Sequence, residues 1–193
     1  MTDASRAPST TVGHLRRGGT SVVVRLDAST FPCILHWGPD LGELDADALD
    51  ALVVALQPPY VDSPISSQEA VALLPQHSSG WLGRPGLLGS RAGRAWSVAF
   101  DEVEHAIDEA GTPDWADGSP GAVRLRSEGI DRPSELHVTT ELELHPSGLL
   151  RVRATVRNTG SDDYEVTHML PALPVPAEAG ELLDMTGRHT HER

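Results

Sequence analysis

Histidines and carboxylates are the first candidates for chemistry in this sequence. His189 and His191 are separated by one residue, so on a strand both imidazoles would share one face, and Glu192 follows them. A zinc site needs a further protein ligand at a fixed place, and nothing in the pattern makes His168 that ligand. The stretch is therefore interpreted as a solvated tail, and neither a metal site nor any other cofactor is expected.

Acidic residues also cluster between positions 101 and 117. Paired carboxylates can act as a general acid and a general base when burial raises the pKa of one of them. This segment is polar and rich in turn residues, with no apolar surroundings that would raise a pKa. A solvated face or loop is expected there, made of Asp101, Glu102, Glu104, Asp108, Glu109, Asp114 and Asp117.

Nucleophilic catalysis is not indicated either. The nearest match to Gly-x-Ser-x-Gly, in residues 89–93, has the wrong spacing. The single cysteine, Cys33, lies in an apolar run and is predicted to be a core residue. The sequence contains no lysine, which excludes Schiff-base chemistry and a lysine general base. We therefore assign no catalytic residue within the chain.

Length and charge bound the class of protein. The chain has 193 residues and a formal net charge of -13, which argues against nucleic-acid or anionic-membrane partners. No apolar run reaches the ~18 residues of a membrane span, and no signal-peptide core is present, so a cytoplasmic protein is expected. Residues 1–9 are expected to be a disordered tail, and residues 10–193 a single domain.

Strand patterns dominate this domain. Apolar and β-branched runs predict strands at residues 20–27, 31–37, 94–103 and 122–128. Three further segments alternate apolar and polar residues and are joined by short turns, which predicts an antiparallel meander with one wet face. An apolar face must pack on a second sheet. The meander segments are residues 134–145, 149–158 and 164–170, and Glu141 and Glu143 are predicted to lie across from Arg151 and Arg153.

One helix is predicted near residues 44–56, with Asp45 as its N-cap. Residues 57–94 are rich in proline and glycine and are predicted to hold little regular structure. The aromatic side chains of Trp37, Trp96 and Phe100 are expected in the core. The predicted fold class is therefore all-β, an antiparallel β-sandwich with one short helix.

Three patches of the sequence occur in the order and spacing of one known family. They are residues 35–42 (Leu-His-Trp-Gly-Pro-Asp-Leu-Gly), residues 80–91 (Gly-Trp-Leu-Gly-Arg-Pro-Gly-Leu-Leu-Gly-Ser-Arg), and the segments from Leu149 through 173–176 to 183–193. With them the chain resembles the N-terminal β-sandwich domain of the α-galactosidases of glycoside hydrolase family 36. His189 departs from the pattern, because the family usually has an aromatic residue there.

The resemblance implies an antiparallel β-supersandwich that precedes a (β/α)8 catalytic barrel. Retaining hydrolysis needs two carboxylates from that barrel, and the family's nucleophile motif begins with a lysine, which this chain lacks. The resemblance thus implies a fragment that is inactive alone. It would support the barrel and the assembly of a homo-oligomer in an enzyme that acts on α-galactoside sugars. The alternative is a free-standing carbohydrate-binding β-sandwich module.

Trp81 and Arg84, in the glycine-rich loop, are the candidates for a substrate mouth. An indole can stack on a sugar ring, and a guanidinium can donate hydrogen bonds to hydroxyls. The loop resembles one that reaches toward an active-site mouth, sometimes that of a neighbouring subunit. The competing interpretation is that Trp81 anchors the loop to its own domain and Arg84 forms an ordinary ion pair.

Overall fold

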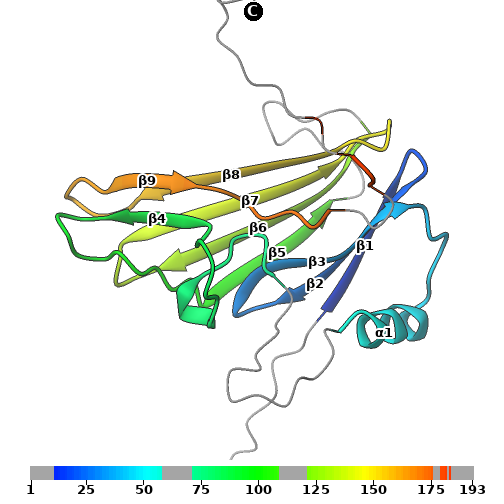
Figure 1. Cartoon of the computed structure of the whole chain (residues 1–193), viewed down its shortest axis with the longest axis horizontal. Coiled ribbons are helices and arrows are strands. Elements are labelled where there is room, and N and C mark those ends of the chain that lie inside the picture. Colours follow the sequence, from blue (N-terminus) through cyan, green and yellow to red (C-terminus); the bar gives the residue numbers. More distant parts are fainter. Residues whose placement is uncertain (1–10, 58–70, 109–120, 176–178, 182, 184–193) are drawn as a thin grey trace, which may run out of the picture.

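Antiparallel sheets make up most of the structure (Figure 1). The computed structural model describes residues 11–57, 71–108, 121–175, 179–181 and 183. These residues contain one α-helix, α1 (Ala46–Ala55), and one 3-10 turn, η1 (His77–Ser79). The all-β prediction with a single short helix is confirmed. The strands are β1 (Thr11–Arg17), β2 (Thr20–Asp27), β3 (Thr30–Pro39), β4 (Leu87–Ser90), β5 (Glu102–Asp108), β6 (Val123–Asp131), β7 (Leu136–Leu144), β8 (Leu150–Asn158) and β9 (Glu165–Met169).

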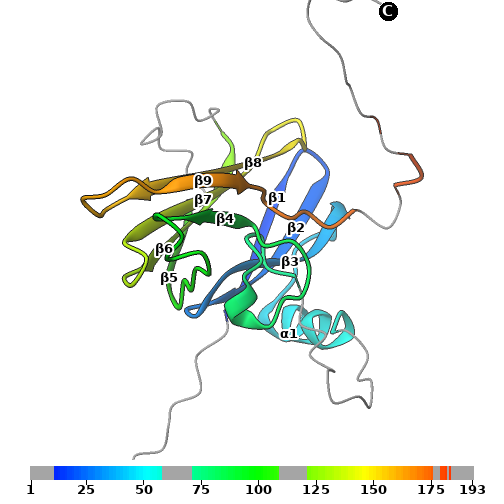
Figure 2. The same ribbon diagram turned by 60° about the vertical axis from the view of Figure 1, so that its left-hand side comes forward.

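Two small sheets cover the apolar face of one larger sheet. The larger sheet has the order β5-β6-β7-β8, and the smaller ones are β1-β2-β3 and the pair β4-β9 (Figures 1 and 2). Strand β7 shows how the cover is divided. Its Leu142 and Leu144 belong to a core shared with β1 and β2, whereas Leu136 and Val138 belong to a second core under β4. The domain is therefore a sandwich with two adjoining apolar cores.

The period-two pattern predicted the central hairpin correctly. In the β7–β8 pair Glu143 lies opposite Arg151, and Glu141 lies opposite Arg153. The ion pairs have N···O distances of 3.0 Å and 4.0 Å respectively. The pattern did not reveal that Glu143 is buried, together with Arg124 of β6 at 3.2 Å. Arg124 comes from β6, which pairs with β7 on the side opposite β8, so alternation within the hairpin could not predict this partner.

The last strand of the predicted meander is placed elsewhere. β9 forms at the expected residues but pairs with β4 and not with β8. In the turn between β8 and β9, the Asn158 side chain donates to the Asp162 carbonyl at 2.7 Å. This turn carries the chain from the larger sheet into the facing layer, so sequence adjacency did not predict the partner. Strand β4 lies inside the glycine-rich stretch 57–94, and β1 lies just after the expected tail; both were missed.

The strand predicted at 94–103 is wrong. β5 begins only at Glu102 and continues through the acidic segment in which a loop was expected. Before it, side chains and not a neighbouring strand bind the backbone. The Ala99 N–H donates to the Asp131 carboxylate at 2.9 Å, and the Phe100 N–H donates to Gln76 Oε1 at 2.7 Å. An apolar run can therefore stay irregular, because other groups satisfy its polar backbone.

The aromatic side chains expected in the core divide into three cases. Phe100 is buried, as is the predicted core thiol of Cys33, and Trp37 is half-buried against the first core. Trp96, in contrast, is 62% exposed, so its placement in the core was wrong. The reason is that residues 95–97 follow a tight hairpin and do not form the expected strand.

Helix α1 matches its prediction to within two residues at each end. The Ala48 N–H donates to the Asp45 side chain at 2.8 Å, which confirms the N-cap. No residue of the helix is buried. Local interactions such as the cap must therefore supply much of its stability. No helix among the described residues has the length and apolarity needed to cross a lipid bilayer.

The substitution Asp45→Ala is expected to destabilise α1 by about 1 kcal/mol, because it removes the acceptor for one N-terminal N–H. Amide hydrogen exchange of residues 46–55 measures the effect locally. Asp47→Ala is the matched control, since Asp47 lies in the first turn without capping it and contributes only about 0.3–1 kcal/mol through the helix dipole. Equal acceleration of exchange in both variants would contradict the capping role.

Candidate functional site

Trp81 closes the glycine-rich loop on itself. Its indole Nε1 donates to the Arg84 carbonyl at 2.9 Å, and its backbone N–H donates to the Gln76 carbonyl at 3.3 Å. The ring also lies against Gly83, where an added Cβ would come within 2.6 Å of the indole. Trp81 therefore has the contacts of a loop anchor, and only part of its surface is left for a ligand.

The two predicted mouth residues meet through the Arg84 backbone and not through paired side chains. The Arg84 side chain is exposed and makes no ion pair with any described residue. Beside it Leu82 is 84% exposed at the tip of the loop, which sequence reasoning missed. The only signal for Leu82 was its position between Trp81 and a glycine. A contact of Trp81 or Arg84 with a sugar stays a prediction.

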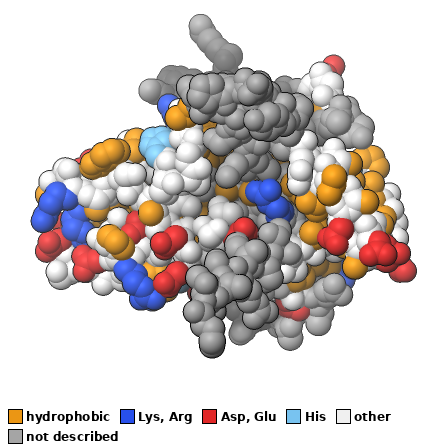
Figure 3. Space-filling view, turned by 90° about the horizontal axis from the view of Figure 1, so that it is seen from below, with side chains coloured by type: hydrophobic (Ala, Val, Ile, Leu, Met, Phe, Trp, Pro, Cys, Tyr) orange, Lys and Arg blue, Asp and Glu red, His pale blue; other side chains and the backbone are white. Residues whose placement is uncertain are grey.

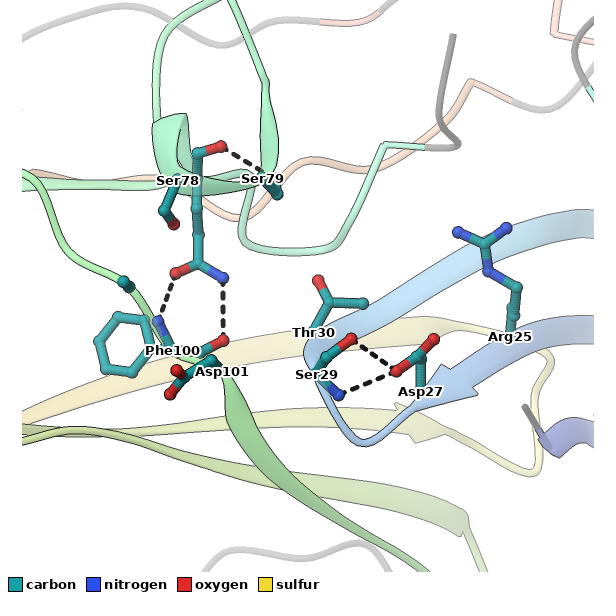
Figure 4. Close-up of a pocket in the computed structure, with 10 residues that line it drawn as sticks. Arg25, Asp27, Ser29, Thr30, Ser78, Ser79, Phe100 and Asp101 are labelled. Carbon is teal, nitrogen blue, oxygen red and sulfur yellow. Dashed lines mark hydrogen bonds between the residues drawn. The ribbon is translucent and has the colours of Figure 1, made fainter. Parts of the chain in front are cut away.

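A hollow of about 610 Å³ lies beside the base of this loop (Figure 4). Segments far apart in the sequence line it, namely the end of β2 with the β2–β3 turn, η1, and the residues before β5. Gln76 joins two of them, because its side-chain amide accepts from the Phe100 N–H at 2.7 Å and donates to the Phe100 carbonyl at 3.3 Å. The polar side chains that line the hollow are Arg25, Asp27, Ser29, Thr30, Gln76, Ser78, Ser79 and Asp101.

The electrostatics of the hollow favour polar binding over acid–base catalysis. Asp27 accepts hydrogen bonds from the Ser29 hydroxyl at 2.7 Å and the Ser29 N–H at 2.9 Å. These bonds, with a smaller effect of the Arg25 charge, lower the pKa of Asp27. A general acid at neutral pH needs a raised pKa. Asp27 thus stays a carboxylate, able to accept hydrogen bonds from hydroxyl groups of a ligand.

The other sequence candidates do not converge on this hollow. Asp101 lines its rim, but Glu102 and Glu104 lie exposed on β5. Six of the predicted residues lie outside the described part of the chain, namely Glu109, Asp114, Asp117, His189, His191 and Glu192. No group of three or more His, Cys, Asp or Glu side chains suited to a metal ion occurs in the described part of the chain. Sequence reasoning missed the hollow because it forms only where three segments that are at least 20 residues apart meet.

Comparisons with known proteins place the chain in a family. Residues 30–193 match the family described as the Glycosyl hydrolase family 36 N-terminal domain. An alpha-galactosidase of Escherichia coli is 28% identical over 161 residues, which are 82% of this chain and 20% of that protein. The chain therefore spans about a fifth of the length of this relative.

Solved structures show the same fold. A variant of the GH36 alpha-galactosidase AgaA from Geobacillus stearothermophilus, in complex with 1-deoxygalactonojirimycin, matches 83% of this chain with a TM-score of 0.64 and 17% identity. The match covers 24% of that chain. Another variant in complex with raffinose gives a TM-score of 0.60 and 18% identity over the same shares. With the family match over most of its length, this chain belongs to the N-terminal domain family of glycoside hydrolase family 36.

Proposed function

We propose that this chain acts as the non-catalytic N-terminal region of an α-galactosidase. In that role it supports a (β/α)8 catalytic barrel, contributes to the assembly of a homo-oligomer, and shapes the mouth of a site for terminal α-galactosides. The support comes from the domain family and from the E. coli alpha-galactosidase relative.

The observation that carries the proposal is an apolar strip after β9. The strip consists of Leu170, Leu173 and Val175, all exposed, with Val175 at 74%. It is held against the domain, because the Leu170 N–H donates to the Gly86 carbonyl at 2.7 Å and the Ala172 N–H donates to the Leu73 carbonyl at 2.8 Å. Exposed apolar side chains grouped in this way are typical of an interface. In the proposed role, a catalytic barrel or another subunit would cover this strip.

The isolated chain is expected to self-associate through this strip. Sedimentation velocity at several protein concentrations measures the distribution of oligomers. The double variant Leu173→Ser/Val175→Ser should shift the distribution toward monomer, because it removes apolar surface from the contact. Val54→Ser is the matched control, since Val54 is 67% exposed but lies on α1. A wild-type chain that stays monomeric at all concentrations would count against the proposed interface. No hydrolysis of a chromogenic α-galactoside above background is expected from the chain alone.

The substrate-mouth part of the proposal concerns the loop that Trp81 closes. Because Trp81 holds the turn, the side chains of Leu82 and Arg84 project from a shaped loop. A free-standing carbohydrate-binding module is the second candidate, favoured by the hydroxyl-lined hollow beside this loop.

A further inference from the structure

Trp96 lies at the opposite end of β4 from the Trp81 loop. β4 ends at Ser90, and Arg91 and Arg94 then close a tight hairpin through backbone hydrogen bonds of 2.7 Å and 3.0 Å. Trp96 follows this hairpin with 62% of its surface exposed. Arginine and acidic side chains gather at the corresponding end of the molecule, at the left of Figure 3. The exposed indole thus follows a hairpin that carries two arginines.

A hollow of about 470 Å³ lies between the hairpin that precedes Trp96 and the turn that leads into β9. Tyr164 lines this hollow, and its hydroxyl donates to the carbonyl of Ala95, the residue directly before Trp96, at 3.2 Å. Adjacent Cα atoms are about 3.8 Å apart. Trp96 therefore directly follows a residue that is hydrogen-bonded to the wall of the hollow. The charged side chains around the hollow are Arg91, Arg94, Asp162, Asp163 and Glu165.

The wall of this hollow is firmly held. Arg91 is only 7% exposed and donates to the Ser134 carbonyl at 3.1 Å, to Asn158 Oδ1 at 2.8 Å and to the Asp162 carbonyl. Its guanidinium lies 5.8 Å from the centroid of the Tyr164 ring. These contacts join the end of β4 to the β6–β7 turn and to the end of β8 with the turn that follows it. A wall held in this way is pre-organised, which lowers the entropic cost of binding a ligand.

The rim offers side chains that are not engaged elsewhere. Among the described residues, Arg94, Asp162, Asp163 and Glu165 have no ion pair and no side-chain hydrogen-bond partner. Burial raises the pKa of Tyr164, so its hydroxyl stays neutral. Ala92 and Ala95 have φ values of 49° and 53°, in the left-handed region that non-glycine residues rarely adopt. Strained backbone of this kind often occurs at binding sites.

We propose that Trp96 and this hollow form a binding site for an oligosaccharide of neutral, hydroxyl-rich rings, distinct from the Trp81 loop. The exposed indole offers an electron-rich face on which the C–H groups of a sugar ring can stack. The carboxylates of Asp163 and Glu165 accept hydrogen bonds from hydroxyls, and the Arg94 guanidinium donates them. The two arginines and three acidic residues that line the hollow have a net charge of about -1, which favours an uncharged ligand over an ion.

The surroundings of Trp96 differ from those of a protein-docking surface. The apolar strip of Leu170, Leu173 and Val175 groups several aliphatic side chains. Trp96 is flanked instead by exposed Ser97 and by the hairpin with Arg94. A single aromatic platform surrounded by unengaged polar groups fits a sugar better than an aliphatic protein face.

The test titrates the 193-residue chain with stachyose. The choice of this probe rests on the proposed function, whereas the site is argued from the structure independently of that function. Calorimetry should show saturable binding with a Kd of about 1 mM. Stachyose should also protect tryptophan fluorescence from quenching by acrylamide. Trp96→Ala should weaken binding by at least about tenfold, because the stacking platform is lost, while the unfolding transition stays unchanged. Trp96→Phe should retain part of the affinity.

Leu149→Ala is the matched control, because Leu149 is 66% exposed but lies in the β7–β8 turn, at the other end of β8 from the hollow. It should leave stachyose binding unchanged. Absence of saturable binding, or equal affinity of Trp96→Ala and wild type, would overturn the assignment. So would a Trp96→Ala variant that changes only the sedimentation behaviour, since Trp96 would then be a protein contact. Failure here leaves the barrel-support proposal intact, because that proposal depends on the Leu173→Ser/Val175→Ser variant.

Discussion

Glu143→Ala is expected to lower the free energy of unfolding by about 3–5 kcal/mol, the usual cost of removing one partner of a buried ion pair. Glu143 and Arg124 are 2% and 1% exposed. Glu143 Oε2 accepts from Arg124 Nε at 3.2 Å and from Arg151 Nη2 at 3.0 Å. Without this carboxylate the buried Arg124 guanidinium loses a charged hydrogen-bond acceptor and gains no contact with water in its place. Urea unfolding followed by circular dichroism measures the loss.

Glu141→Ala provides the control on the same strand. Glu141 is less deeply buried, and its ion-pair distances to Arg126 and Arg153 are 3.8 Å and 4.0 Å. Its loss should cost no more than about 1 kcal/mol. Replacing both Arg124 and Glu143 with leucine should recover part of the stability lost in Glu143→Ala, because no charge is then left buried without compensation. Equal effects of Glu143→Ala and Glu141→Ala would show that burial does not control this pair.

Phe31→Ala is expected to destabilise the domain by about 3–5 kcal/mol, because it opens a cavity in the second core. Phe31 is fully buried and meets Phe100 edge to face, with ring centroids 5.6 Å apart and an interplanar angle of 70°. Gly129 of β6 makes room for the ring, since an added Cβ there would come within 2.8 Å of Phe31 Cζ. Because Gly129 has no side chain, this position of β6 offers no atoms that could fill the space left by the ring. The shift in the midpoint of urea unfolding, at constant m-value, measures the effect.

Trp96→Ala is the matched control for Phe31→Ala. It removes a larger aromatic side chain, but one that is mostly exposed, so stability should change by less than about 0.5 kcal/mol. A loss of several kcal/mol would mean that Trp96 packs into the domain after all. The comparison also separates a structural role of Trp96 from its proposed role in binding.

Different parts of the domain suit different functions, namely the polar hollow, the Trp81 loop and the apolar strip. The rigid sandwich places loops at its ends, and loops held by a rigid scaffold commonly carry binding functions. Trp81 is committed to shaping its own loop, whereas Trp96 presents an open ring. The residue chosen from the sequence as the sugar contact thus has the more structural environment of the two.

Local patterns in the sequence determined the features that depend on neighbours along the chain. The β7–β8 hairpin and its Glu–Arg pairing followed from period-two alternation and a short turn, because a strand that buries one face has only one suitable register. The Asp45 cap followed from side-chain-to-backbone bonding within three residues. The sequence patches from residue 35 onward led to the domain family that residues 30–193 match.

Tertiary structure alone decided the features that depend on distant segments. Several features join residues at least 19 positions apart. They are the pairing of β9 with β4, the burial of Arg124 with Glu143, and the two hollows. Gln76 and Asp131 bind the backbone before β5, which left that apolar segment irregular and Trp96 at the surface. Periodicity reports which face of a segment is apolar. It carries no information on which distant segment covers that face, and burial and binding sites depend on that cover.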